Sequence, residues 1–155
     1  MAHDFNEYII TKRYVLNRSV AIHTTIIESI FNTTSTIAIV GLSENANRPS
    51  NRVGNYLINN GFEVIPVNPN LESVLGQKCY PDLIQIPVQV DLVNIFRRSE
   101  YVKPVVEEAI RIGVKSVWMQ DGVKNDEAAK LASDAGVLVI MDDCIYRQHK
   151  RKVQM

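Results

Sequence analysis

The stretch T-I-A-I-V-G-L-S, residues 36–43, decides the fold of this 155-residue chain. Its first five residues are small or β-branched, a composition typical of a strand that is buried on both faces. The strand pattern breaks at Gly41 into a polar loop, and a helix pattern follows over residues 51–60. A buried strand, a small-residue loop and a helix form the first unit of a nucleotide-binding α/β domain, in which the loop N–H groups and the helix N-terminus face a phosphate.

Four further strand patterns follow the first one, and helix patterns of about ten residues separate most of them. Strands are expected over residues 62–68, 91–96, 114–120 and 137–142, and helices over 20–32, 51–60, 102–112 and from 125 to a stop signal at Gly136. This alternation implies right-handed crossovers and a parallel sheet. The sequence therefore predicts an α/β fold, a doubly wound, Rossmann-like parallel sheet of about five strands in the order 3-2-1-4-5, with helices on both faces.

The chain divides into a short arm and one domain. We assign residues 20–155 to the domain, including a basic C-terminal tail over Arg147–Lys152, and residues 1–19 to an N-terminal arm or extension. The arm is too apolar for a disordered tail and fits neither the helix nor the strand period. It would pack on its own domain, on a second copy in a homodimer, or on another protein partner, and the sequence leaves these three alternatives open.

Composition excludes several classes of partner. Seventeen basic and seventeen acidic side chains cancel, so no overall field favours nucleic acid or an anionic membrane. No apolar run approaches the ~20 residues that span a bilayer, and the N-terminus lacks the order of a signal peptide. A cytoplasmic location is therefore expected, with Cys79 and Cys144 as two reduced thiols.

The loop after the first strand suits an anion. Gly41 permits close backbone approach, the hydroxyls of Ser43 and Ser50 can donate to phosphate oxygens, and Arg48 adds a charged fork. The alternative is a polar surface loop in which Ser50 serves as the N-cap of the following helix.

The ends of the next strands argue against a nicotinamide cofactor and for a polyphosphate. A carboxylate normally follows the second strand of an NAD-binding domain, but here Asn68 and Pro69 stand in that place. The third strand ends at Phe96, and Arg97 and Arg98 follow it, one step from a helix N-terminus, where two arginines would concentrate positive potential. The alternative for Arg97 is a solvated surface position.

The remaining strand ends offer little catalytic chemistry. After the fourth strand, Gln120 and Gly122 can contact a ligand, whereas Trp118 is expected in the core. After the fifth strand, two carboxylates and Cys144 stand side by side, but all three histidines lie outside the strand ends. Neither a metal site nor acid–base catalysis is therefore favoured.

At these residues the chain resembles the small, single-domain CoA-binding proteins. Their Rossmann-like fold is also the N-terminal CoA-binding domain of succinyl-CoA synthetase α subunits and of ADP-forming acyl-CoA synthetases. The resemblance covers residues 36–144, and its motifs occur in the family's order. They are I-A-I-V-G-L-S at 37–43, R-P-S at 48–50, V-I-P-V-N-P at 64–69, L-G at 75–76, D-L-V-N-I-F-R-R at 91–98, V-W-M-Q-D-G at 117–122 and M-D-D-C at 141–144.

The resemblance implies a small-molecule nucleotide ligand, coenzyme A or an acyl-CoA, and assigns roles by position. The phosphate loop would contain Gly41, Ser43, Arg48 and Ser50; Asn68 and Pro69 would border the adenine or ribose; Phe96 and Arg97 would supply a wall and a charge; Gln120 and Gly122 would border the pantetheine path. CoA carries a pyrophosphate and a ribose 3′-phosphate, so extra arginines without a ribose carboxylate suit CoA better than NAD.

Two departures limit what the resemblance implies. The family usually has arginine in the place of Asp143, and it offers nothing for the first twenty or so residues. The synthetases also need further domains for catalysis, so we expect binding without catalysis. An NAD(P)-dependent oxidoreductase and a CoA-responsive regulatory or interaction protein remain as alternatives, and a mixed disulfide between Cys144 and a CoA thiol is a further open point.

Overall fold

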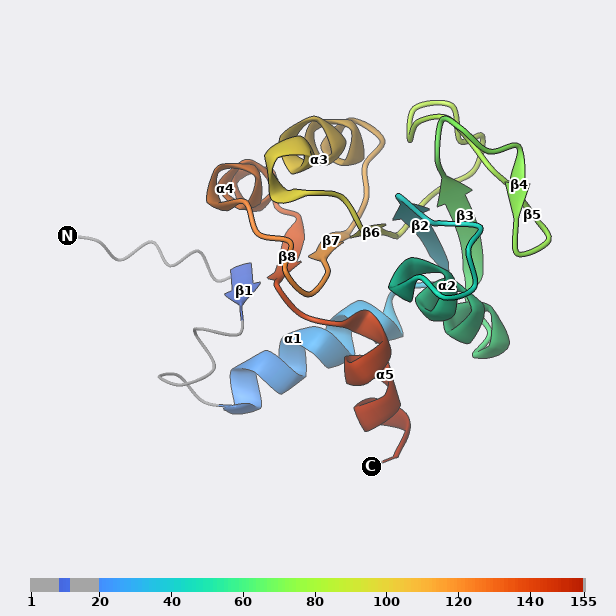
Figure 1. Cartoon of the computed structure of the whole chain (residues 1–155). Helices are drawn as coiled ribbons and strands as arrows, with labels where there is room; N and C mark the ends of the chain where they lie inside the picture. The colour runs from blue at the N-terminus through green and yellow to red at the C-terminus, as the bar shows by residue number, and fades with distance from the viewer. Residues whose placement is uncertain (1–8, 12–19, 155) are drawn as a thin grey trace.

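A computed structural model describes residues 9–11 and 20–154 of the chain. It contains one six-stranded sheet, parallel throughout, in the order β1-β8-β7-β6-β2-β3 (Figure 1). The strands are β1 (Ile9–Thr11), β2 (Thr36–Val40), β3 (Glu63–Val67), β6 (Leu92–Ile95), β7 (Ser116–Met119) and β8 (Leu138–Met141). The helices are α1 (Val20–Asn32), α2 (Pro49–Asn59), η2 (Ser99–Tyr101), α3 (Val102–Arg111), α4 (Asp126–Asp134) and α5 (Ile145–Val153), and β4 (Ser73–Val74) with β5 (Gln77–Lys78) forms a separate hairpin.

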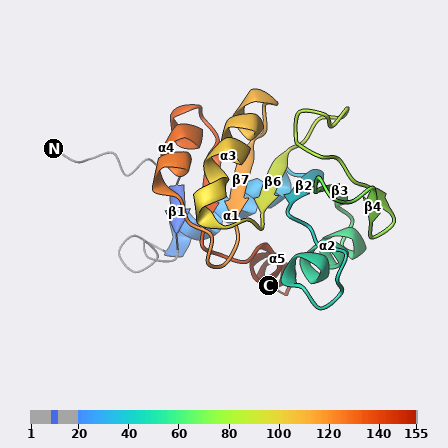
Figure 2. The same ribbon diagram turned by 45° about the horizontal axis from the view of Figure 1, so that its top comes forward.

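Helices cover both faces of the sheet, which confirms the predicted α/β, Rossmann-like class. Helices α3 and α4 lie on one face and α1, α2 and α5 on the other (Figures 1 and 2). The strand residues alternate between the two resulting cores, so Val117 faces α3 and α4 while Trp118 packs on the opposite side. Trp118 is fully buried, as expected, and its indole N–H donates to the Asp143 carbonyl at 2.9 Å.

The predicted strand order 3-2-1-4-5 is wrong in the place of the third strand. The expected strands one to five are β2, β3, β6, β7 and β8, and their observed order is 2-1-3-4-5. β3 is therefore an edge strand, which suits Pro66 because proline has no N–H to donate to a second neighbour. The order reverses at β2, so the crevice lies at the carboxyl ends of β2 and β6.

The N-terminal arm contributes a sixth strand. Ile9 to Thr11 pairs in parallel with Val139 to Met141 at the outer side of β8. The rest of the predicted arm, residues 1–8 and 12–19, lies outside the described residues, and so does any contact of these residues with a partner.

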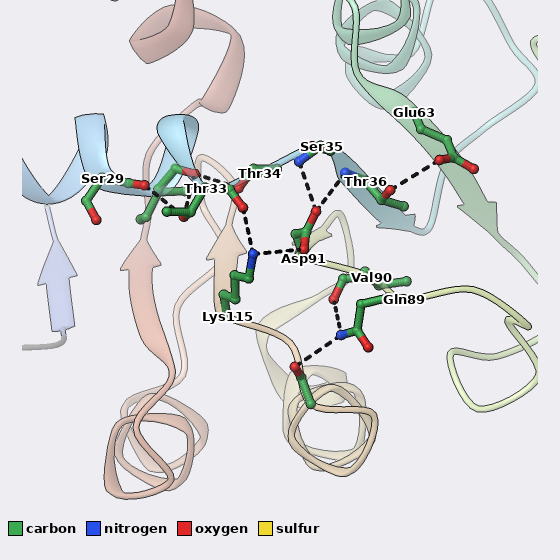
Figure 3. A network of polar contacts seen from close by, with 12 residues as sticks. Ser29, Thr33, Thr34, Ser35, Thr36, Glu63, Gln89, Val90, Asp91 and Lys115 are labelled. Carbon is green, nitrogen blue, oxygen red and sulfur yellow. Dashed lines mark hydrogen bonds and ion pairs between the residues drawn. The ribbon is translucent and has the colours of Figure 1, made fainter.

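At the amino ends of the strands, the partly buried carboxylate of Asp91 holds three chain segments together (Figure 3). Asp91 accepts hydrogen bonds from the N–H groups of Ser35 and Thr36 at 2.9 and 3.1 Å, and its second oxygen lies 3.3 Å from Lys115 Nζ. Burial raises the pKa of Asp91, but the two N–H groups and Lys115 outweigh it, and the pKa falls below its ordinary value. This network fixes the start of β2 and β6, opposite the crevice.

The basic tail over Arg147–Lys152 forms part of helix α5. His149 anchors this helix: it is buried, its ring packs edge-on against Phe31 and Phe62, and its Nδ1 lies 2.8 Å from the Tyr56 hydroxyl. Burial and the charge of Lys152 lower the pKa of His149. Over the described part of the chain, no helix is long and apolar enough to cross a membrane.

Candidate functional site

A cleft of about 450 Å³ opens at the carboxyl ends of β2 and β3, and Arg97 at the end of β6 also lines it. Its volume falls within the roughly 300–1,000 Å³ of typical small-molecule pockets. It is formed by the ends of β2 and β3 with the turns after them, the crossover between β3 and β6, the end of β6 and the first half of α3. The lining residues are Val40, Gly41, Val67, Asn68, Pro69, Asn70, Pro81, Asp82, Leu83, Arg97, Pro104, Val105 and Glu108.

Gly41 allows the ends of the central strands to come together. Its φ is +85°, and a Cβ at this position would lie 2.3 Å from the Phe96 carbonyl oxygen. Its N–H donates to the Val67 carbonyl at 2.9 Å, so the ends of β2, β3 and β6 meet around this residue. Only glycine combines this conformation with this close approach.

The loop from Ser43 to Ser50 is closed by its own hydrogen bonds. The Ser43 N–H donates to the buried Ser50 hydroxyl at 3.0 Å, and the Asn51 amide donates to the Ser43 carbonyl at 2.8 Å. The alternative in which Ser50 serves as the N-cap is wrong, because α2 begins at Pro49 and Arg48 occupies the N-cap position without a side-chain hydrogen bond. Proline at the first helical position supplies the start signal instead.

The turn after β3 is equally well held. Asn68 Nδ2 donates to the Leu42 carbonyl at 3.2 Å, and Asn68 Oδ1 accepts from the Asn70 N–H at 2.9 Å. These bonds tie the turn to the loop after β2 and place Pro69 in the wall of the cleft. The structure thus brings Gly41, Asn68, Pro69 and Arg97 of the predicted site together in one cleft.

Two of the predicted arginines are free to meet an anion. Arg97 lines the cleft, and its guanidinium carbon lies 5.4 Å from the centre of the Tyr101 ring. Within the part of the chain that the structure describes, neither Arg97 nor Arg48 forms an ion pair. The Phe96 ring is half-buried against the core on the α2 side, whereas its carbonyl faces Gly41. The positive charge of the cleft therefore lies beside the closest backbone approach.

Gln120 and Gly122 lie outside the residues that line the cleft. Gln120 is buried, and its side-chain oxygen accepts from the Ile145 N–H at 3.0 Å, which caps the start of α5. The exposed Gly122 donates its N–H to Asp142 Oδ1 at 2.8 Å. Both residues shape the neighbouring strand ends.

Asp143, where the family usually has arginine, is a buried anion with its own cation. Its carboxylate accepts from Arg147 Nη2 at 2.7 Å, from Gln148 Nε2 at 2.8 Å and from the Cys144 N–H at 2.8 Å. Arg147 also binds both oxygens of Asp121, and these hydrogen bonds raise the pKa of Arg147. The network joins the end of β7 to α5. The guanidinium of Arg147 is thus already bound by the carboxylates of Asp121 and Asp143.

The two cysteines do not pair with each other. Cys79 is a buried free thiol next to the cleft, where its Sγ lies 3.4 Å from the Asn68 carbonyl, and burial raises its pKa. Cys144 is a half-buried free thiol at the N-cap of α5. No group of three His, Cys, Asp or Glu side chains with metal-binding geometry occurs in the residues described.

Sequence reasoning missed one wall of the cleft. Pro104, Val105 and Glu108 come from α3, and Pro81 to Leu83 come from the crossover between β3 and β6. The helical spacing of 104, 105 and 108 places these residues on one face, a signal that could have been found. The crossover shows neither a helix nor a strand spacing of apolar residues, so its position in the cleft wall could not be predicted from the sequence.

A family model for the CoA binding domain matches residues 35–150, which is most of the chain. The chain belongs to this family. The uncharacterized protein YneT of Bacillus subtilis is 39% identical over 123 residues, which are 79% of this chain and 91% of that protein. Acetate–CoA ligase [ADP-forming] II of Archaeoglobus fulgidus is 31% identical over 96 residues, which cover 61% of this chain and 14% of the ligase. This chain is thus homologous to one region of a much longer ligase.

Among solved structures too, the chain matches a small protein over most of its length and a longer synthetase over one region. A hypothetical protein from Pyrococcus horikoshii OT3 superposes with a TM-score of 0.82 at 38% identity, over 84% of this family member and 92% of that chain. The dinucleotide forming acetyl-coenzyme A synthetase 1 of Ca. Korarchaeum cryptofilum superposes with a TM-score of 0.63 at 25% identity, over 70% of this chain and 26% of the synthetase.

Proposed function

We propose that this protein binds CoA or an acyl-CoA in the cleft at the carboxyl ends of β2, β3 and β6, without catalysis of its own. The single observation that carries the proposal is that Arg97 lies directly beside Gly41 in the cleft. Gly41 lets the ends of β2 and β6 approach closely, and beside it Arg97 offers a guanidinium that forms no ion pair with the described residues. Membership of the CoA binding domain family supports the same ligand.

The pyrophosphate would lie against the Gly41 loop, where Arg97 and Arg48 supply charge and the Ser43 hydroxyl can donate. Ser50 would act indirectly, since its hydroxyl already holds the Ser43 N–H. Asn68 and Pro69 would border the ribose or adenine, and the Phe96 carbonyl would mark the opposite side. Gln120 and Gly122 would border the pantetheine path by shaping the strand ends beyond the cleft.

A nicotinamide cofactor fits this cleft less well. The end of β3 carries no carboxylate for the adenosine ribose hydroxyls, and the side-chain amide of Asn68 is already bonded to Leu42 and Asn70. Among the described residues, the cleft lining includes no histidine, and its two carboxylates, Asp82 and Glu108, already accept hydrogen bonds from Gln85 and from the Leu83 N–H.

Isothermal titration calorimetry of the full chain tests the proposal. CoA, acetyl-CoA and NADH are titrated separately into the purified protein at the same ionic strength. We expect saturable binding of CoA and acetyl-CoA and much weaker binding of NADH. Binding of NADH without binding of either CoA species would overturn the proposed function.

A further inference from the structure

The cleft is lined by charged groups of both signs. Arg97 lies beside Gly41, with its Cδ 3.5 Å from the position of a Cβ there, and carries the only positive charge among the described lining residues. Asp82 and Glu108 also line the cleft, and their carboxylates would repel a phosphate. The part of the ligand that meets the carboxylates must therefore be a hydrogen-bond donor.

The two carboxylates differ in their freedom to bind. Asp82 closes its own turn, since its two oxygens accept from the N–H and the side-chain amide of Gln85 at 3.0 and 3.1 Å. Glu108 Oε2 accepts from the Leu83 N–H at 3.2 Å, which joins α3 to the crossover and fixes the carboxylate. Its second oxygen, Oε1, accepts no hydrogen bond from the residues that the structure describes.

The surroundings of Glu108 suit a flat aromatic ring. Pro69, Pro81, Pro104 and Val105 line the same cleft and present apolar surface without competing donors. A purine base buries two apolar faces and carries polar atoms only at its edge. A fixed acceptor beside this apolar surface favours the edge of a base that donates a hydrogen bond.

We infer that the cleft holds the adenine of the ligand and that Glu108 Oε1 accepts a hydrogen bond from the 6-amino group, which makes Glu108 a specificity-determining residue. This inference rests on the proposed function and adds the orientation of the ligand, with the base toward α3 and the pyrophosphate toward Gly41. Glu108 would thereby recognise the 6-amino group of adenine. Hypoxanthine has a carbonyl oxygen at this position, so Glu108 would distinguish the two bases.

The substitution Glu108→Gln tests this role with little change in shape. In the variant, the Leu83 N–H would still donate to the side-chain oxygen of residue 108. The amide NH₂ would then take the place of Oε1. The variant therefore presents a donor where the wild type presents an acceptor. Glu107→Gln is the matched control, because Glu107 is the exposed neighbour on the same helix and does not line the cleft.

The readout is the ratio of dissociation constants for CoA and its inosine counterpart, in which a carbonyl oxygen replaces the 6-amino group. We expect the wild type and Glu107→Gln to prefer CoA by about 10- to 100-fold, the effect of one hydrogen bond to a charged group. In Glu108→Gln the preference should vanish or reverse. Binding of CoA with no preference, or an unchanged preference in Glu108→Gln, would overturn the inference alone, whereas no binding of CoA by the wild type would overturn the proposed function.

Discussion

Gly41 is the residue on which the geometry of the cleft depends. An alanine there would place its methyl group 2.3 Å from the Phe96 carbonyl oxygen, which belongs to the adjacent central strand end. The Arg97 side chain lies 3.5 Å from the same point. The end of β2 and the end of β6 would therefore have to separate, and the charge beside them would move.

Gly41→Ala should lower the free energy of unfolding by about 2–4 kcal/mol, from backbone strain together with overpacking. Gly61→Ala is the control, since Gly61 has φ +89° but nothing within 4 Å of its Cβ position. It should cost only the strain, about 1 kcal/mol. Urea denaturation of both variants measures the difference, and equal losses would show that the Phe96 contact is unimportant.

Arg97→Ala should weaken CoA binding by about 1.5–3 kcal/mol, the contribution of a charged hydrogen bond. Arg97→Lys should recover only part of this, because an ammonium lacks the planar fork that matches phosphate. Arg111→Ala, at the exposed end of α3, is the control and should bind CoA normally. Calorimetry at two salt concentrations checks the assignment, since unchanged affinity of Arg97→Ala would exclude a phosphate contact.

Among the elements, β2 and β6 depend on Asp91 at their amino ends. Asp91→Asn should lower the free energy of unfolding at pH 7 by about 1.5–3 kcal/mol, because the bonded group loses its charge. The lowered pKa of Asp91 means that its contribution is present above about pH 3.8 and is lost as the pH falls through the folded-state pKa. Urea midpoints between pH 7 and pH 3 should therefore converge for wild type and Asp91→Asn. The exposed Glu72→Gln serves as control, and parallel curves for Asp91→Asn would contradict the prediction.

Helix α5 depends on a neutral His149. The pKa of this residue is lowered in the folded state, so its contribution is present above about pH 6.5 and is lost as the pH falls through the folded-state value. His149→Phe would leave the Tyr56 hydroxyl without its partner, at a cost of about 1–3 kcal/mol at pH 7.5. It should also flatten the change in unfolding free energy between pH 7.5 and pH 5. An unchanged pH profile would show that His149 does not control it.

The sequence predicts elements better than it predicts their neighbours. Apolar periods located all five strands of the central fold, because burial on both faces of a parallel sheet leaves a clear pattern. Strand order depends on which strand edges pair, and the spacing of apolar residues along the sequence carries no information about this pairing. Pro66 held the relevant signal, since an edge position for β3 is incompatible with the order 3-2-1-4-5.

The site was predictable where a strand ends and unpredictable where distant segments converge. Gly41, Asn68 and Arg97 were found because parallel strands place their carboxyl ends at one edge. Glu108 was missed because its place in the cleft depends on how α3 meets the crossover, a contact between residues 25 positions apart. The partners of Ser50 and Gln120 are likewise set by folding and not by spacing.

At the scale of the whole molecule, a ligand that bridges β2, β3 and α3 should stabilise the fold. CoA at a free concentration 100 times its dissociation constant should raise the free energy of unfolding by about 2.7 kcal/mol. Arg97→Ala at the same concentration should gain less, because the gain rises with the logarithm of the ligand concentration divided by the dissociation constant. Thermal unfolding followed by circular dichroism measures both, and no shift for the wild type would contradict binding to the folded state.

The crossover from β3 to β6 has no helix, and only the β4–β5 hairpin interrupts its irregular course. It is tied to the sheet at a few points, such as the Tyr80 N–H to the Pro66 carbonyl at 3.0 Å. Surface connections of this kind accept changes of sequence and length that a packed helix would not. One wall of the cleft can therefore diversify in evolution while the sheet and the Gly41 loop stay intact, so that a single scaffold can acquire new ligand preferences through this segment alone.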